Sequence, residues 1–284
     1  MKQKNVVAIH DISCHGKCSL TVAMPIISAT GITTNIIPTA VLSTHTGGFT
    51  NYTFKDLTDQ ISPIQKHWED LNFKFDGIYT GFLGSFEQLD LVGKFIDKFK
   101  KNNIVIIDPA MADNGKMYPI FDMEFASGMA DLCKKADIVV PNITEALFLL
   151  GKEYIDGPYS KSFIESILLE LKEKLGVKKV VLTGTDFDDN TYGISTYDEK
   201  NNSFDYHICE KIGGSYHGTG DIYASALFSA LLHDFPLIKS AEIAATFTAQ
   251  AIKNTIENVN PDDYKSGMQF ESALPLLIKN LKLI

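Results

Sequence analysis

The apolar and polar positions of the chain alternate between two periodicities, one typical of buried strands and one typical of amphipathic helices. Continuous apolar or β-branched runs predict strands at residues 6–9, 35–42, 77–80, 104–107, 138–140 and 180–182. Between them, apolar residues at intervals of three and four, such as Leu57, Ile61, Ile64 and Trp68, predict helices. These helices are expected at residues 20–29, 54–71, 89–100, 124–133, 145–150 and 161–175.

The pattern changes in the last third of the chain. Two alternating runs, 193–197 and 204–209, flank a polar segment and predict an antiparallel hairpin at the edge of the sheet. From Thr219 onward the chain reads as helical, with breaks near Pro236 and Pro261. Alternating strands and helices favour right-handed crossovers and a mainly parallel sheet between two layers of helices. We therefore expect a three-layer αβα fold. Because no linker, repeat or compositional boundary interrupts the chain, residues 1–284 are expected to form a single domain.

The composition narrows the function without naming it. The chain has 284 residues, 45% of them hydrophobic and 21% charged, which suits an ordinary globular protein with a large core. A net charge of −9 and the absence of a basic run argue against nucleic-acid binding. No apolar segment approaches the roughly 18 residues of a membrane span. The first residues do not resemble a signal peptide, and four cysteines form no disulfide framework, so a cytoplasmic location is expected.

The segment His217-Gly218-Thr219-Gly220-Asp221 is the strongest chemical signal. Its glycines permit a tight turn, and the helix that follows would direct free N–H groups at an anion. Asp221 would repel that anion unless its task is to take a proton from an attacking hydroxyl. Taken alone, a glycine-rich turn with an aspartate that caps a helix is the more ordinary interpretation.

Two further motifs also follow predicted strands. Asn142-Ile143-Thr144-Glu145 could be a capping box, and the acidic residues of the segment from Asp108 to Gly115 could be turn residues. In an open α/β sheet, however, ligands bind at the carboxyl ends of the strands. Asp108, Asp113, Glu145 and Asp221 would meet there, and such a gathering of carboxylates is stable only with cations.

The order of these motifs resembles the ribokinase-like superfamily. Within it, residues 42–47, 80–85, 108–115, 141–145 and 217–221 are similar to the pyridoxal and pyridoxamine kinases, and the similarity covers almost the whole chain. The resemblance implies that Asp221 is the base, with Gly218, Thr219 and Gly220 forming the anion hole for the γ-phosphate. It implies that the following residues contact ATP: Asp108, Asn142, Glu145, Thr183, Gly218 and Gly220. It implies Mg²⁺ near Asp108, Asp113 and Glu145.

For the acceptor, the resemblance implies a site lined by Asp11, Thr46, Gly47, Phe82 and Asp221. Asp11 stands where many members of the family have a serine, and the segment 13–19 lacks their glycine-rich sequence. His45 is expected to make a structural hydrogen bond in its loop. The segment 211–217 is expected to close over ATP, because Gly213 and Gly214 give it hinge freedom.

The predicted reaction transfers the γ-phosphoryl group of ATP to the 5′-hydroxymethyl group of pyridoxal, pyridoxamine or pyridoxine. A kinase of the same fold acting on hydroxymethylpyrimidine is the alternative, since both acceptors are flat nitrogen heterocycles with a hydroxymethyl group. A non-catalytic ligand-binding regulator with this fold is the second alternative. The resemblance also implies a monovalent cation such as K⁺ and a homodimer.

Overall fold

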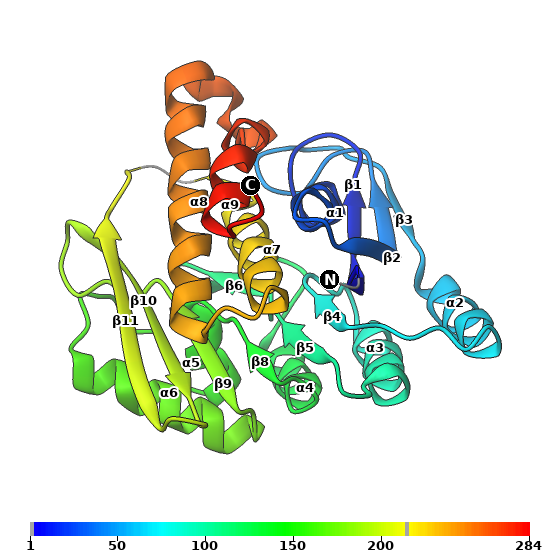
Figure 1. Ribbon diagram of the computed structural model, residues 1–284. Helices are drawn as coiled ribbons and strands as arrows, with labels where there is room; N and C mark the ends of the chain where they lie inside the picture. The colour runs from blue at the N-terminus through cyan, green and yellow to red at the C-terminus, as the bar shows by residue number, and fades with distance from the viewer. Residues whose placement is uncertain (1–2, 214–215) are drawn as a thin grey trace. The chain divides into compact units, whose positions relative to one another are not determined.

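The computed structural model describes residues 3–213 and 216–284, which divide into two compact units (Figure 1). The first, unit 1, comprises Met1–Gly81 and Ile212–Ile284, and the second, unit 2, comprises Phe82–Lys211. The division brings the two ends of the sequence into the same unit. The candidate residues near positions 11, 46 and 221 therefore belong to unit 1, and those between positions 82 and 183 belong to unit 2.

Unit 1 is built on four strands and the helices that pack on them (Figure 1). The strands follow the order β4-β1-β2-β3, with β1 parallel to β2 and β4 and with β3 antiparallel to β2. The elements of its first part are β1 (Asn5–Ser13), α1 (Leu20–Ala29), β2 (Thr33–Leu42), β3 (Phe54–Asp56), α2 (Thr58–Asp70) and β4 (Gly77–Thr80). Its second part contains α7 (Thr219–Leu232), α8 (Leu237–Asn258), the 3₁₀ segments Pro261–Ser266 and Glu271–Ala273, and α9 (Leu274–Asn280).

The core of unit 1 explains why α7 is apolar on every side. Helix α7 packs against both α1 and α8, and the long helix α8 runs beside it (Figure 1). Its side chains from Ile222 to Ala230 are all buried, with small Ala and Ser residues on both sides of the larger Leu227 and Phe228. Small residues let neighbouring helices approach closely, so the candidate base Asp221 starts a helix that is fixed by its surroundings.

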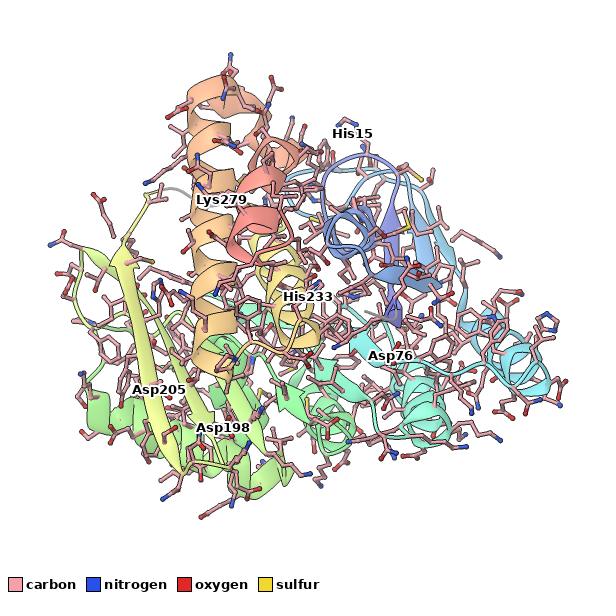
Figure 2. All side chains as sticks on the ribbon, viewed as in Figure 1. His15, Asp76, Asp198, Asp205, His233 and Lys279 are labelled. Carbon is pink, nitrogen blue, oxygen red and sulfur yellow. The ribbon has the colours of Figure 1, made fainter. Side chains whose placement is uncertain are left out.

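Unit 2 contains the remaining strands in the order β5-β8-β9-β10-β11. Strands β5, β8 and β9 are parallel, and β10 pairs antiparallel with both β9 and β11. Asp198 and Asp205 lie on the β10–β11 hairpin (Figure 2). The elements are α3 (Phe86–Phe99), β5 (Ile104–Ile107), β6 (Ala112–Asp113), β7 (Lys116–Met117), α4 (Met123–Cys133), β8 (Ile138–Val139), α5 (Ile143–Leu150), α6 (Lys161–Leu175), β9 (Lys179–Thr183), β10 (Thr191–Asp198) and β11 (Ser203–Glu210).

The predicted fold class is confirmed, with two local corrections. Parallel strands form the centre of each unit, β4-β1-β2 in unit 1 and β5-β8-β9 in unit 2, and unit 2 carries the expected antiparallel hairpin β10–β11. The single helix predicted for residues 54–71 is wrong at its start, because residues 54–56 pair with β2 as strand β3. Asp56 then ends this strand by accepting a hydrogen bond from the N–H of Thr58, at 2.7 Å, where α2 begins.

The second correction concerns the segment after β5, which was expected to be a loop. It contains the short hairpin β6–β7, whose turn residues Asn114 and Gly115 both have positive φ. The predicted breaks near Pro236 and Pro261 are confirmed, since α7 and α8 end before them. Gly214 of the predicted hinge lies outside the described residues. Within the described part of the chain, no helix is long and apolar enough to cross a membrane.

Candidate functional site

Asp221 is a carboxylate held in place at the beginning of α7. The turn before it depends on Gly218, whose φ is +81° and where an added Cβ would lie 2.1 Å from the carbonyl oxygen of Lys17. The side chain of Asp221 is 18% exposed, and its Oδ2 accepts a hydrogen bond of 2.9 Å from the backbone N–H of Ser19. Its Oδ1 lies 4.0 Å from Nδ1 of the fully buried His10.

The electrostatic surroundings adapt Asp221 to accept a proton near neutral pH. Burial raises its pKa to about 6, the charge of Asp11 adds to this effect, and the hydrogen bond from Ser19 opposes it. A carboxylate with such a pKa is ionised at pH 7 and yet basic enough to take a proton from an alcohol that is attacking phosphorus. The arrangement therefore fits a general base.

Asp11 is a buried carboxylate beside Asp221. It lies near the end of β1, is 6% exposed, and accepts hydrogen bonds from Ser19 Oγ at 2.6 Å and from Ser13 Oγ at 3.4 Å. Burial raises the pKa of Asp11, and the two hydroxyl groups lower it. The thiol of Cys18 lies in the same surroundings. Burial, together with the charges of Asp221 and Asp11, raises its pKa and keeps it protonated.

The loop that carries Thr46 and Gly47 is held by His45, as predicted. The backbone N–H of Gly47 donates to His45 Nδ1 at 3.1 Å, so the ring proton is on Nε2, which donates to the carbonyl oxygen of Lys265 at 2.6 Å. An added Cβ on Gly47 would lie 2.5 Å from the ring of His217. Thr46 itself is exposed, which leaves its side chain available to a ligand.

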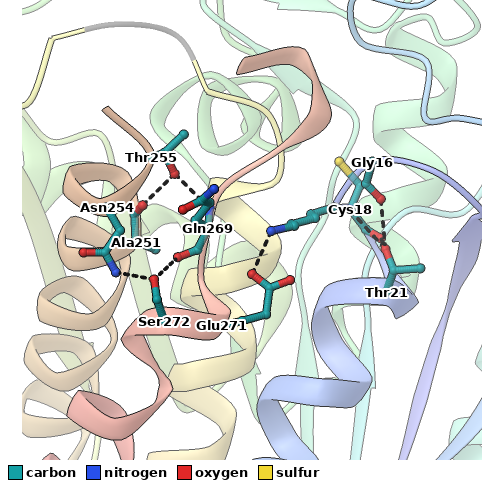
Figure 3. Close-up of polar contacts among 10 residues, drawn as sticks. Gly16, Cys18, Thr21, Ala251, Asn254, Thr255, Gln269, Glu271 and Ser272 are labelled. Atoms are coloured by element: carbon teal, nitrogen blue, oxygen red, sulfur yellow. Dashed lines mark hydrogen bonds and ion pairs between the residues drawn. The ribbon is translucent and has the colours of Figure 1, made fainter. Parts of the chain in front are cut away.

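The segment between β1 and α1 is anchored at several points, three of which Figure 3 shows. Thr21 Oγ1 donates to the carbonyl oxygens of Gly16 and Cys18, at 3.2 and 2.7 Å. Lys17 forms an ion pair with Glu271 at 2.7 Å, and its backbone N–H donates to the carbonyl oxygen of Ser266. These contacts tie the approach to Ser19 to the C-terminal part of unit 1.

In unit 2, Asn142 and Glu145 form the capping box that their spacing indicates. The side chain of Asn142 accepts from the N–H of Glu145, and Glu145 Oε2 accepts from the N–H of Asn142, both at 2.9 Å. The same two side chains reach the loop after β5, since Glu145 Oε1 accepts from the N–H of Met111 and Asn142 Nδ2 donates to the carbonyl oxygen of Ala112. The cap therefore also fixes the loop that follows Asp108.

Asp108 and Glu145 are buried together, at 8% and 3% exposure. Burial raises the pKa of Glu145 strongly, the charge of Asp108 raises it further, and backbone hydrogen bonds oppose the shift. A cation would relieve this repulsion, and two carboxylates suit Mg²⁺, which takes most of its ligands from phosphate and water. Asp113 is exposed and accepts hydrogen bonds from Asn114. Among the described residues, no group of three or more His, Cys, Asp or Glu side chains is arranged to hold a metal.

The other two predicted residues of unit 2 lie in different surroundings. Thr183 ends β9 next to Asn142, and its N–H donates to the carbonyl oxygen of Pro141 at 3.0 Å. Phe82 is half-buried, with its ring 5.5 Å from that of Phe121, which stacks on Phe125 at 3.9 Å. Phe121 was not predicted, although its position in the sequence between Tyr118 and Phe125 was a signal.

Unit 1 thus brings together Asp11, Asp221 and two residues that sequence reasoning missed, His10 and Ser19. Both nitrogens of His10 lack a hydrogen-bond partner among the described residues. The positions of these two residues, at the end of the first predicted strand and just before the first predicted helix, were the available signal. Unit 2 separately brings together Asp108, Asn142, Glu145 and Thr183.

Comparison with known proteins identifies the family. Residues 25–265 match the phosphomethylpyrimidine kinase family. The chain belongs to this family. Pyridoxal kinases, the group that the motifs resemble, are also among the relatives of this chain, and the predicted resemblance and fold are confirmed.

The relatives of this chain are of two kinds. The pyridoxal kinase of Dictyostelium discoideum is 28% identical over 79% of this chain and 77% of its own. The hydroxymethylpyrimidine/phosphomethylpyrimidine kinase of Aquifex aeolicus is 26% identical over 65% of this chain and 69% of its own.

A Bacteroides thetaiotaomicron protein assigned to the phosphomethylpyrimidine kinases is 34% identical to this chain. Its rhombohedral crystal structure has a TM-score of 0.93 and covers 98% of this chain and 94% of its own. A second, orthorhombic form of that protein, with pyridoxal, has a TM-score of 0.91. The chain is therefore a small-molecule kinase by family, and the relatives do not separate the two acceptor classes.

Proposed function

We propose that this protein is a B6-vitamer kinase that transfers the γ-phosphoryl group of ATP to the 5′-hydroxymethyl group of pyridoxal, pyridoxamine or pyridoxine. The observation that carries this proposal is the half-buried carboxylate of Asp221, with a pKa of about 6, at the start of a helix behind a glycine turn. The pyridoxal kinase relatives and the Bacteroides structure with pyridoxal support the choice of acceptor.

In the proposed reaction, Asp221 accepts the proton of the hydroxymethyl group while the oxygen of that group attacks the γ-phosphorus of ATP, and ADP leaves. The N–H groups of Gly218, Thr219 and Gly220 would stabilise the charge on the transferring phosphoryl group. Asp11, Thr46, Gly47 and Phe82 would bind the vitamer.

Most of the residues proposed to bind the nucleotide lie in unit 2. Asn142, Thr183 and the buried carboxylates of Asp108 and Glu145 would bind MgATP, with Asp113 as a further contact to the ion. Mg²⁺ would neutralise the phosphate charge that Asp108 and Glu145 repel. We also propose a monovalent cation such as K⁺ and a homodimer, on the resemblance to pyridoxal kinases alone, and a cytoplasmic location, on the small number of cysteines.

A hydroxymethylpyrimidine kinase is the second candidate, and the relatives from Aquifex aeolicus and Bacillus subtilis favour it. The reaction and the role of Asp221 would be the same, because that acceptor also carries a primary hydroxymethyl group. Asp11 bears on the choice, since a carboxylate can accept a hydrogen bond either from a protonated ring nitrogen or from an exocyclic amino group. A non-catalytic regulator is disfavoured, because binding alone requires no base at Asp221.

The decisive experiment measures ADP formation with MgATP and each of pyridoxal, pyridoxamine, pyridoxine and hydroxymethylpyrimidine, for the wild type and for Asp221→Asn. Turnover on a B6 vitamer that falls by a factor of about 10³ or more in the variant would support the proposal. Turnover on the pyrimidine alone would move the enzyme to the second candidate. Ligand binding without any ADP formation would identify a regulator.

A further inference from the structure

Ser19 has a backbone conformation that side-chain-bearing residues rarely adopt. Its φ is 56° and its ψ is −129°, a combination that glycine tolerates and that brings the Cβ of other residues into steric conflict. Residues with positive φ are usually Gly, Asn or Asp in a turn, and Ser19 is neither in a turn nor one of these types. It immediately precedes α1 as its N-cap, and yet its side chain makes no capping hydrogen bond. The strain therefore needs a compensation elsewhere.

The compensation consists of two hydrogen bonds to two different carboxylates. The hydroxyl of Ser19 donates to Asp11 Oδ1 at 2.6 Å, a length typical of a charge-assisted bond. Its backbone N–H donates to Asp221 Oδ2 at 2.9 Å. The conformation with positive φ directs this N–H at Asp221. The bond of the hydroxyl to Asp11 holds the residue in that conformation.

The neighbours of Asp221 leave few other groups that could hold it. The titratable side chains that face it are Asp11, His10 and Cys18. The ring of His10 is 4.0 Å from Oδ1, beyond hydrogen-bond distance, and burial lowers the pKa of His10 to about 3, so the ring is neutral. Cys18 stays protonated. The N–H of Ser19 therefore donates the hydrogen bond that fixes the orientation of Asp221 among these neighbours.

We propose that Ser19 is the positioning residue of the phosphoryl transfer: its hydroxyl bond to Asp11 locks a strained backbone, and the N–H that this backbone presents orients the base Asp221. The inference rests on the proposed function for the role of Asp221 as the base. The two acidic side chains and Ser19 then form one interacting group. Asp11 raises the basicity of Asp221 through its charge, and Ser19 limits that increase.

Substitutions of Ser19 and of Asp11 are expected to shift the titration of Asp221 in opposite directions. Replacing Ser19 by Ala removes the lock and leaves a strained residue, so its N–H turns away and Asp221 titrates at a higher pH, by about one pH unit. Ser19→Gly loses the same hydroxyl without strain and moves the titration in the same direction by less. Asp11→Asn keeps an acceptor for the hydroxyl and removes the charge, so Asp221 titrates at a lower pH, again by about one unit.

The test titrates the carboxyl groups by ¹³C NMR in protein labelled at aspartate Cγ, with Asp221 assigned by the signal missing from Asp221→Asn. Ser28→Ala is the matched control, because Ser28 is exposed on the same helix. If Ser19→Ala fails to fold, Ser19→Gly and Asp11→Asn still give the two opposite shifts. An Asp221 titration that does not move in Ser19→Ala or Ser19→Gly, or that moves upward in Asp11→Asn, would overturn the proposal.

Kinetics separate this inference from the proposed function. In an active wild type, we expect Ser19→Ala to lower kcat by about tenfold with little change in KM for ATP, and Ser19→Gly to lower it less. Equal losses in the two variants would contradict the role of the backbone conformation. A wild type without turnover would count against the proposed function, and the NMR titration would then still decide whether Ser19 controls Asp221.

Discussion

Asp221→Asn is expected to stabilise the protein while abolishing its proposed activity. The substitution removes the charge of a carboxyl group that burial disfavours. Its amide oxygen can still accept the hydrogen bond from Ser19, which in the wild type is 2.9 Å long. The side chains are nearly equal in size, so packing changes little. The perturbation therefore isolates the electrostatic cost of keeping an ionised base at this position.

The magnitude follows from the pKa of Asp221, which is raised from its ordinary value of 3.8 to about 6. The folded state binds the proton of Asp221 more tightly than the unfolded state. The stability that this proton contributes is therefore fully present below pH 3.8 and is lost as the pH rises through 6. The full loss corresponds to about 3 kcal/mol. The side chain is 18% exposed, and water relieves part of this cost. We therefore expect Asp221→Asn to be more stable than the wild type by about 1–3 kcal/mol at pH 7.5 and by about 1 kcal/mol or less at pH 4.5.

Urea denaturation at pH 4.5, 6.0 and 7.5, followed by circular dichroism, measures this difference in the free energy of unfolding. Asp59→Asn is the control, since Asp59 is an exposed carboxylate on α2, and its effect should stay small. If Asp221→Asn were no more stable than the wild type at pH 7.5, or if its advantage shrank as the pH rose, Asp221 would not be a carboxylate ionised at a cost. Asp221 would then lack the raised basicity that its proposed role as a base requires.

Three further predictions concern the rate, the cap and the glycine turn. The kcat/KM of the wild type should fall by about tenfold between pH 7 and pH 5 as Asp221 protonates, and a profile flat to pH 5 would be incompatible with its pKa of about 6. Asn142→Ala should lower the free energy of unfolding by about 1–2 kcal/mol, more than Ser160→Ala. Asn142 bonds both Glu145 and Ala112, in a different loop, whereas the bonds of Ser160 stay within the first turn of α6, to Phe163 and the exposed Ser162; equal losses in urea denaturation would contradict this. Gly220→Ala should keep the melting temperature, since nothing lies within 4 Å of the added Cβ, but should raise KM for ATP by about tenfold or more if the turn holds phosphate.

Much of the fold could be predicted because it depends on local pattern. The apolar run at residues 6–9 became the centre of β1, and the two alternating runs around positions 193 and 208 became the β10–β11 hairpin. Strand β3 could not be predicted in this way. Its residues 54–56 are all exposed, and they form a strand only because the backbone of β2 offers them hydrogen bonds. A strand of three exposed residues has no hydrophobic pattern of its own.

The candidate site likewise has features that local sequence indicates and features that only tertiary contacts decide. Asp221 was recognisable from the glycines before it, and Asn142 and Glu145 from their spacing, because caps and turns are made by residues close together in sequence. The tertiary structure decided what these residues touch. Glu145 also bonds Met111, 34 positions away, and Asp221 receives the N–H of Ser19, 202 positions away.

The sequence by itself therefore determined most of the strands and helices, and which short motifs carry carboxylates and glycines. Only the tertiary structure decided how basic Asp221 is and which residue orients it. Burial and the charge of Asp11 set the first, and the unusual backbone of Ser19 sets the second. A pKa depends on the solvent and charges around a group, and a hydrogen bond depends on direction, and neither is encoded in the spacing of residues along a chain.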